Sequence, residues 1–202
     1  MTLNKSTTIY CKAGNAYHLR LINADDGDAL GRFFEQLKAA TRLRFGPHPL
    51  TADYAKSFCE KIKHEPNLIN AFVIEAVMSS KHNQSKQTSN IVGYVITDSD
   101  LKKYPHDVNR YADYGVNLNA GKHWVFAPCI ADALQSSGLA TAALTVIKQK
   151  ATQLAISSLI LMGGTQTSNS QAVAFYKKNR FKTLGAFKTE VDNIDMHLEI
   201  TN

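Results

Sequence analysis

Apolar residues recur at helical spacing in four segments of the chain. In the first segment, Leu30, Phe33, Phe34 and Leu37 lie at positions i, i+3, i+4 and i+7, directly after an acidic stretch suited to a helix N-terminus. Glycine and prolines at 46–49 end that segment, and Thr51 is a suitable cap for the next. The pattern predicts helices over residues 28–37, 52–63, 138–154 and 169–179.

Short β-rich runs predict seven strands. The last run alternates Ile194, Met196, Leu198 and Ile200 at period two, as in a half-buried strand. The seven predicted strands span residues 17–22, 71–78, 91–97, 124–130, 159–162, 182–187 and 194–200. The second and third flank residues 79–90, which contain no apolar side chain, so we expect a hairpin with a solvated, mobile loop. Residues 98–121 are polar and rich in tyrosine, and we expect a long surface excursion there.

The order of the predicted elements indicates an α/β (α+β) protein. Strand-to-strand meanders alternate with helical crossovers, which favours a mixed rather than a wholly parallel sheet. The chain has 202 residues and no internal repeat, and its polar stretches are too short to be domain linkers. We therefore expect an N-terminal leader over residues 1–14 and a single domain over residues 15–202.

Composition excludes several protein classes. Hydrophobic residues make up 44% of the chain and charged residues 20%, which is typical of a globular protein. No apolar run approaches the roughly 20 residues of a membrane span, and residues 1–14 lack the apolar centre of a secretory signal. We therefore expect a cytoplasmic protein that does not associate with membranes.

The cysteines and histidines suggest no metal and no disulfide framework. Cys11, Cys59 and Cys129 are odd in number, far apart and not part of a CxxC pair. The seven histidines form neither HExxH nor another paired ligand spacing. We expect reduced thiols and no metal ion.

Net charge adds one indication of function. The chain has 23 Lys and Arg against 17 Asp and Glu, a net charge of +6. This excess favours an anionic partner: nucleic acid, an acidic protein surface or a phosphorylated small molecule. The basic residues are dispersed in the sequence and do not form the stripe with stacking aromatics that nucleic-acid binding requires.

A predicted strand is followed by a helix start made mostly of small residues. The stretch consists of Gln135, Ser136, Ser137, Gly138, Leu139, Ala140 and Thr141. Backbone N–H groups at a helix start have no intrahelical acceptor, and small side chains let an anion such as a pyrophosphate approach them. The alternative is that Gly138 only permits a tight turn between strand and helix.

A second informative stretch spans residues 165–181. Ser168 or Asn169 is suited to cap a helix there, and Gln171 follows Ser168 at the spacing of a capping box. Ala172, Phe175 and Tyr176 form the inner face of that helix. For Tyr176 taken alone, an amphipathic core tyrosine is the simpler interpretation.

Together the two stretches resemble the Gcn5-related N-acetyltransferase (GNAT) family. Its core motif [RQ]xxGx[GA] is matched by Gln135, Gly138 and Ala140. The later part of the family pattern is matched by Asn169, Ala172, Phe175, Tyr176 and Phe181. The order of elements agrees from Tyr17 to Ile200, so the resemblance covers nearly the whole chain. It implies one GNAT-like acyl-CoA N-acyltransferase domain, with a mixed central sheet of about seven strands flanked by four helices.

The resemblance implies acetyl-CoA as co-substrate and an amine as acceptor, in a small molecule or at a protein lysine or N-terminus. The amine would attack the thioester directly within a ternary complex, and Tyr176 would protonate the departing thiolate. The implied CoA-binding residues are Cys129, Ile130, Gln135, Ser136, Ser137, Gly138, Leu139, Ala140, Thr141, Asn169, Tyr176 and Lys178. We expect a monomer or homodimer with no nucleic-acid partner.

Two departures from the family pattern stand out. Pro128 falls where the family often uses a backbone N–H to polarise the thioester carbonyl, and proline has none. The carboxylate that some members carry on the fourth strand is also absent, which leaves His123 and Glu75 as candidate general bases, with a water relay as the favoured path. These departures support an alternative: a catalytically weak module that binds or senses acyl-CoA.

Overall fold

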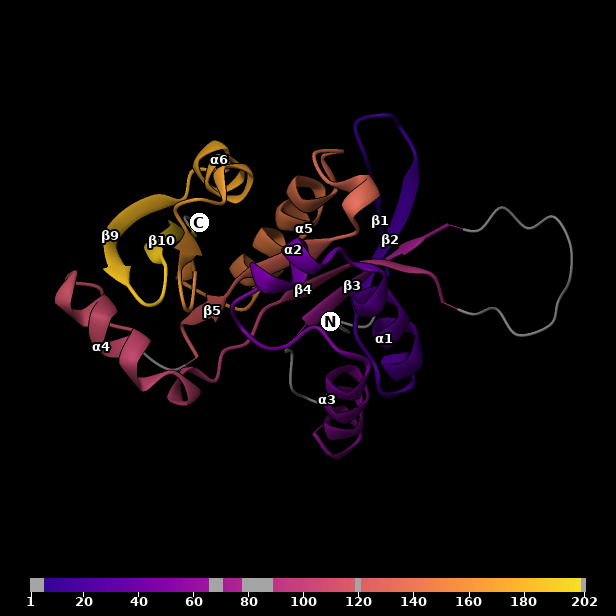
Figure 1. Cartoon of the computed structure of the whole chain (residues 1–202), viewed down its shortest axis with the longest axis horizontal. Coiled ribbons are helices and arrows are strands. Elements are labelled where there is room, and N and C mark those ends of the chain that lie inside the picture. Colours follow the sequence, from indigo (N-terminus) through magenta and orange to yellow (C-terminus); the bar gives the residue numbers. More distant parts are fainter. Residues whose placement is uncertain (1–5, 66–70, 78–88, 119–120, 201–202) are drawn as a thin grey trace, which may run out of the picture. The chain divides into compact units, whose positions relative to one another are not determined.

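The structure is a computed structural model that describes residues 6–65, 71–77, 89–118 and 121–200. The chain forms two compact units, each assembled from two separate stretches of sequence. The first unit contains Met1–Val95 and Pro128–Ala143, and the second contains Ile96–Ala127 and Leu144–Asn202. Figure 1 labels the elements of both.

The first unit is built on a five-stranded sheet in the order β1-β2-β3-β4-β6. Its strands are β1 (Thr7–Tyr10), β2 (Ala16–Leu21), β3 (Ala71–Ala76), β4 (Ile91–Ile96) and β6 (Ala127–Ile130). β2 pairs antiparallel with both β1 and β3. β3 is apolar and almost completely buried over its first four residues, so it lies in the core of this unit.

Four helical segments lie between β2 and β3 in the sequence. They are the 3-10 turn η1 (Ala24–Asp26), α1 (Gly27–Gln36), α2 (Ala39–Leu43) and α3 (Ala52–His64). Asn23 and Asp26 form a reciprocal capping box at η1, and the Thr51 hydroxyl caps α3. Gly31 lets α1 approach α3 closely, because a Cβ atom there would lie 3.2 Å from Ala52 Cα.

The second unit contains a mixed sheet in the order β5-β7-β10-β8, with β9 also paired to β10. Its strands are β5 (His123–Val125), β7 (Ser158–Ile160), β8 (Thr165–Gln166), β9 (Lys182–Lys188) and β10 (Asp192–Glu199). β5 and β7 run parallel, and β10 runs antiparallel to its partners. The helical parts are η2 (Leu101–Lys103), α4 (Pro105–Asp113), α6 (Ser170–Lys178) and most of α5 (Leu139–Gln153).

The fold class and the four predicted helices are confirmed, and the described residues add elements that the pattern did not indicate. They form ten strands and six α-helices, against the expected seven and four. β1 lies within the segment expected to be a leader, and the strand expected over residues 124–130 divides at Phe126, with β5 paired to β7 and β6 next to β4. The residues expected to form the mobile hairpin loop lie largely outside the described residues.

Within residues 98–121, where we expected a long surface excursion, the chain forms η2 and the helix α4, which the sequence pattern did not indicate. The Tyr111 hydroxyl lies 3.0 Å from the carbonyl oxygens of both Leu161 and Met196. Arg110 pairs with the fully buried Asp195 and stacks over the Phe187 ring. Long-range contacts to β9 and β10 therefore stabilise a helix with little apolar surface of its own.

Candidate functional site

A short connection joins β6 to α5 in the first unit. β6 is followed by the 3-10 turn η3 (Asp132–Leu134) and then by residues 135–138, which we call the helix-entry loop. Ser136 and Gly138 have φ angles of 60° and 92°, in the left-handed region that glycine adopts most readily. The predicted strand-turn-helix geometry is therefore present, with Gly138 immediately before the first residue of α5.

Some backbone N–H groups of this region close the turn, and others are available to bind an anion. The N–H of Gln135 donates to Asp132 O at 3.4 Å, and that of Ser137 donates to Leu134 O at 3.3 Å, so both help close the turn. The first-turn N–H groups of α5 lack acceptors within the helix, and the helix dipole places partial positive charge beside them. The anion-binding capacity predicted for residues 135–141 therefore lies mainly at the start of α5.

The Ser137 side chain adds a polar atom to this loop. Its hydroxyl oxygen is buried and has no hydrogen-bond partner among the described residues. A buried hydroxyl without a partner costs free energy, because it has lost its hydrogen bonds to water. An anionic ligand at the helix start would supply an acceptor, so the residues present fit a phosphate group.

Asp132 connects this region to the segment between α1 and α3. Its carboxylate accepts hydrogen bonds from the Lys38 N–H at 2.8 Å and the Thr41 hydroxyl at 2.6 Å. Desolvation raises the pKa of this carboxyl, but these two hydrogen bonds outweigh it and lower the pKa overall. A cavity of about 410 Å³ lies beside Asp132, between the end of α1 and the start of β4. Sequence analysis assigned no role to this aspartate.

Cys129 and Ile130 are both buried at the end of β6. Burial raises the pKa of the Cys129 thiol to about 12, so the thiol stays protonated at neutral pH. A protonated, buried thiol is a poor nucleophile. Cys129 is therefore not suited to form a covalent acyl intermediate.

Glu75 lies on β3 in the first unit and is already paired. Arg20 donates to both of its carboxylate oxygens at 2.8 Å, and the Ser89 hydroxyl is bonded to one of them. Desolvation raises the pKa of Glu75, but the hydrogen bonds from Arg20 and Ser89 outweigh it and lower the pKa. Arg20 also bridges to the buried Asp26, so Glu75 belongs to a charge network and is a poor proton acceptor.

His123 begins β5 in the second unit, where its ring is buried. Its Nδ1 atom lies 2.8 Å from the Ser158 hydroxyl, the side chain of the paired strand β7. Burial lowers the pKa of His123, so the ring is neutral at pH 7. The hydroxyl contact already occupies one ring nitrogen.

α6 carries Tyr176 and Lys178 in the second unit, and Asn169 immediately precedes it. The Asn169 side chain accepts from the Ala172 N–H at 3.3 Å and caps the helix. Tyr176 is buried and packs edge-on against Phe175 and Phe181, with ring centroids 5.2 and 5.1 Å away. Burial raises the pKa of Tyr176 well above its ordinary value, so the phenol holds its proton at neutral pH. Lys178 is exposed.

His48 lies in an aromatic cluster of the first unit. Sequence analysis did not single out this histidine as a titratable group. The His48 ring stacks on Tyr54 with centroids 3.7 Å apart. Its Nδ1 lies 2.9 Å from Pro49 O and its Nε2 lies 3.2 Å from the Tyr94 hydroxyl. Nδ1 therefore carries the proton and Nε2 accepts from Tyr94. Burial lowers the pKa of His48 to about 4, against the opposing hydrogen bond to Pro49.

We expect His48 to make the protein less stable in acid. Its folded-state pKa lies below that of the unfolded chain, so the unfolded state binds the extra proton and stability falls as pH drops from 6.5 towards 4. The expected loss is about 2 kcal/mol of unfolding free energy between pH 7 and pH 5. Urea unfolding at the two pH values measures it.

His48→Gln, which cannot titrate, is expected to reduce this pH difference, whatever its effect on stability at pH 7. His64→Gln is the matched control, because the His64 side chain is 77% exposed on α3. An undiminished pH difference in His48→Gln would assign the acid sensitivity to other groups.

Comparison with known proteins gives a clear result for the fold. No protein-family model and no curated protein sequence matches the chain. Among solved structures, the ribosomal-protein-S5-alanine acetyltransferase of Vibrio fischeri aligns with a TM-score of 0.68 and 14% identity over 98% of this chain and 97% of its own. The GNAT domain of PAT from S. lividans aligns with a TM-score of 0.67 and 16% identity over 96% of each chain.

A third similar structure contains a CoA derivative. RimJ of Mycobacterium smegmatis, solved in complex with CoA-disulfide, aligns with a TM-score of 0.64 and 15% identity over 96% of this chain and 86% of its own. At these identities the likeness shows the fold. The fold expected from Gln135, Gly138 and the motif around Tyr176 is therefore confirmed.

Proposed function

We propose that this chain, which has the GNAT fold, is an N-acetyltransferase that moves an acetyl group from acetyl-CoA to a primary amine. The observation that carries the proposal is the helix-entry loop. Gly138 takes a left-handed conformation directly before α5, and the Ser137 hydroxyl is buried without a partner among the described residues. This arrangement supports binding of the CoA pyrophosphate at the start of α5. The acceptor is a small-molecule amine, a protein lysine or a protein N-terminus.

In the proposed reaction, the unprotonated amine attacks the thioester carbonyl carbon and forms a C–N bond. The tetrahedral intermediate then collapses, the C–S bond breaks, and the CoA thiolate takes a proton from Tyr176. The Tyr176 phenol is protonated at neutral pH, so it holds the proton that a general acid donates. Tyr176 is then reprotonated from solvent, and no covalent acetyl-enzyme forms.

The amine loses its proton through water in this proposal. Glu75 and His123 are the protein groups considered for this task, but Glu75 is held by Arg20 and the His123 ring faces Ser158. Neither group is expected to be indispensable. The Val125 and Phe126 N–H groups do not polarise the thioester carbonyl in this proposal, because they donate to Asp98 O and Ile160 O.

Acetyl transfer is tested directly by following CoA release from acetyl-CoA in the presence of a panel of polyamines, amino acids and peptides with free lysines or N-termini. We expect at least one acceptor to increase CoA release well above hydrolysis, with a product heavier by one acetyl group in mass spectrometry. Heat-denatured protein is the control. The same panel identifies the acceptor class.

The alternative is a module that binds or senses acyl-CoA without efficient catalysis. Pro128 and the paired state of Glu75 favour it, because both remove groups that would assist the reaction. Tight CoA binding with no acetylated product across the panel would support this alternative. Absence of CoA binding would contradict both functions.

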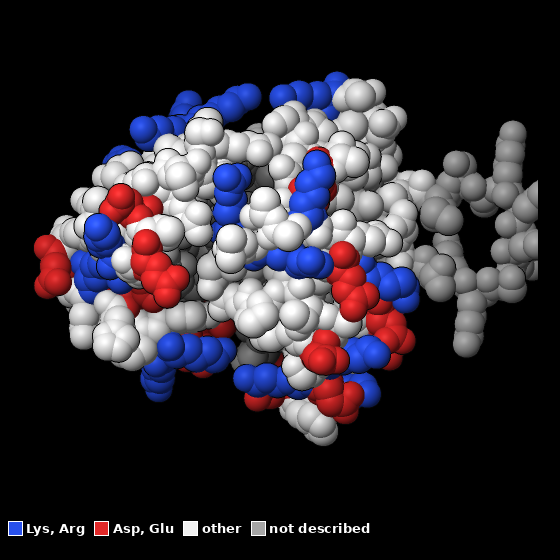
Figure 2. Space-filling model, viewed as in Figure 1, with Lys and Arg blue, Asp and Glu red and all other residues white. Residues whose placement is uncertain are grey.

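Nucleic-acid binding has less support. Figure 2 shows Lys and Arg side chains spread over several parts of the visible face, with Asp and Glu among many of them. Such a distribution differs from the contiguous basic surface of a nucleic-acid interface. Among the residues that the structure describes, no helix is long and apolar enough to span a membrane, and no three metal-ligating side chains are grouped.

A further inference from the structure

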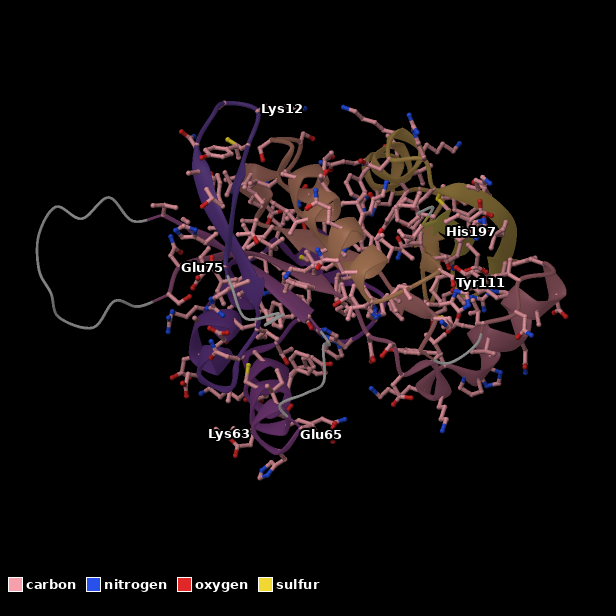
Figure 3. The ribbon with its side chains drawn as sticks, turned by 180° about the vertical axis from the view of Figure 1, so that it is seen from behind. Lys12, Lys63, Glu65, Glu75, Tyr111 and His197 are labelled. Atoms are coloured by element: carbon pink, nitrogen blue, oxygen red, sulfur yellow. The ribbon has the colours of Figure 1, made fainter. Side chains whose placement is uncertain are left out.

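Lys12 reaches the helix-entry loop from a turn 124 residues earlier in the sequence. It lies in the turn between β1 and β2, both in the first unit, and Figure 3 labels it at the tip of that turn. Its backbone N–H donates to Ser137 O at 2.7 Å, and its Nζ atom donates to Ser136 O at 2.9 Å. The turn is therefore joined to the loop through two consecutive carbonyl groups.

These two contacts affect how the loop presents its polar groups. Carbonyl oxygens carry partial negative charge and would repel an anion at the helix start. Lys12 binds the carbonyls of Ser136 and Ser137, the two residues that precede Gly138. With both oxygens turned to Lys12, the N–H groups from Gly138 onward are left to face a ligand.

The Lys12 side chain also passes over Gly138. A Cβ atom on Gly138 would lie 3.0 Å from Lys12 Cγ, so the aliphatic part of the lysine occupies the space that a side chain would need. The ammonium group is exposed and has three N–H donors, of which Ser136 O takes one. Two donors and a full positive charge remain beside the start of α5.

We propose that Lys12 is a further phosphate-binding residue of this site, which orients the helix-entry loop and contributes its ammonium charge to the phosphates of CoA. The proposal rests on the proposed function, because it takes CoA as the ligand. Sequence analysis did not indicate this role for Lys12. Lys12 falls in a segment expected to be a leader, and the family resemblance places no residue there.

The test compares binding of CoA and of pantetheine, which lacks the phosphates, by isothermal titration calorimetry. Lys12→Met keeps the aliphatic part and removes the charge, and we expect it to weaken CoA binding about tenfold, as for the loss of a hydrogen bond to a charged group. Pantetheine affinity should stay unchanged. CoA affinity should also depend less on salt concentration, because one ionic contact is lost.

Lys12→Arg is expected to restore most of the CoA affinity, since it keeps the charge. Lys63→Met is the control for net charge: Figure 3 shows Lys63 on α3, at the end of the first unit away from Lys12. Unchanged CoA affinity in Lys12→Met, or an equal loss for CoA and pantetheine, would overturn the inference while leaving the proposed function intact. Failure of the unaltered protein to bind CoA would overturn the proposed function and this inference together.

Discussion

Gly138→Asp is expected to weaken CoA binding about a thousandfold, by placing a carboxylate where we propose that the pyrophosphate binds. Two further effects act in the same direction. The φ angle of 92° is strained for any residue with a side chain, and the new Cβ atom would lie 3.0 Å from Lys12 Cγ. Equilibrium titration with CoA measures the loss, and circular dichroism checks that the fold is retained.

Two control substitutions separate the charge from the strain. Gly138→Ala introduces the strained Cβ atom without the carboxylate and should lose much less affinity. Gly115→Asp introduces an aspartate at another left-handed position, with a φ angle of 78° and open space around it, and should bind CoA normally. Retained affinity in Gly138→Asp would refute the assignment of the helix-entry loop to CoA phosphates.

The sequence predicted the parts of this site that lie close together in the chain. Gln135 to Ala140 are neighbours, so their small side chains and the strand before them indicate the turn directly. The same holds for α6, whose cap at Asn169 and apolar face at Tyr176 follow helical spacing. Local periodicity reports which face of an element is buried, and that is enough to place these residues on their elements.

Contacts between distant residues escaped prediction, because periodicity does not identify the partner of a buried face. Nothing near Lys12 in the sequence points to Ser136, and nothing near Arg110 points to Asp195 on β10. The latter pair explains why a polar, tyrosine-rich stretch forms α4 instead of an irregular loop. The division of a predicted strand at Phe126 is likewise set by pairing with β4 and β7, which the run of apolar residues cannot reveal.

The candidate general bases show that residue type alone does not predict how readily a side chain accepts a proton. Glu75 is the acidic residue of an otherwise apolar strand and His123 begins another, so both qualified on residue type. The structure gives each a partner, Arg20 for Glu75 and Ser158 for His123, and these contacts decide how readily each accepts a proton. Tyr176 differs, because burial alone favours the protonated phenol that a general acid needs.

Tyr176→Phe is expected to reduce kcat about a thousandfold while CoA affinity stays nearly unchanged, in the range for loss of a general acid. The substitution removes one oxygen and keeps the ring, so the packing against Phe175 and Phe181 is preserved. The proton for the departing thiolate would then have to come from water, at a site that is buried. Single-turnover rates with acetyl-CoA and the best acceptor of the panel measure the chemical step separately from binding.

Tyr111→Phe is the matched comparison, since it removes another buried phenol oxygen of the second unit. The Tyr111 hydroxyl contacts the backbone at Leu161 and Met196, so its loss should lower the free energy of unfolding by about 1 to 2 kcal/mol and leave kcat nearly unchanged. Loss of a general acid should therefore lower kcat and leave stability nearly unchanged, whereas loss of a structural hydroxyl should lower stability and leave kcat nearly unchanged. If Tyr176→Phe instead lowered stability and kept its turnover, Tyr176 would be a core residue of α6 and the thiolate would be protonated by another group.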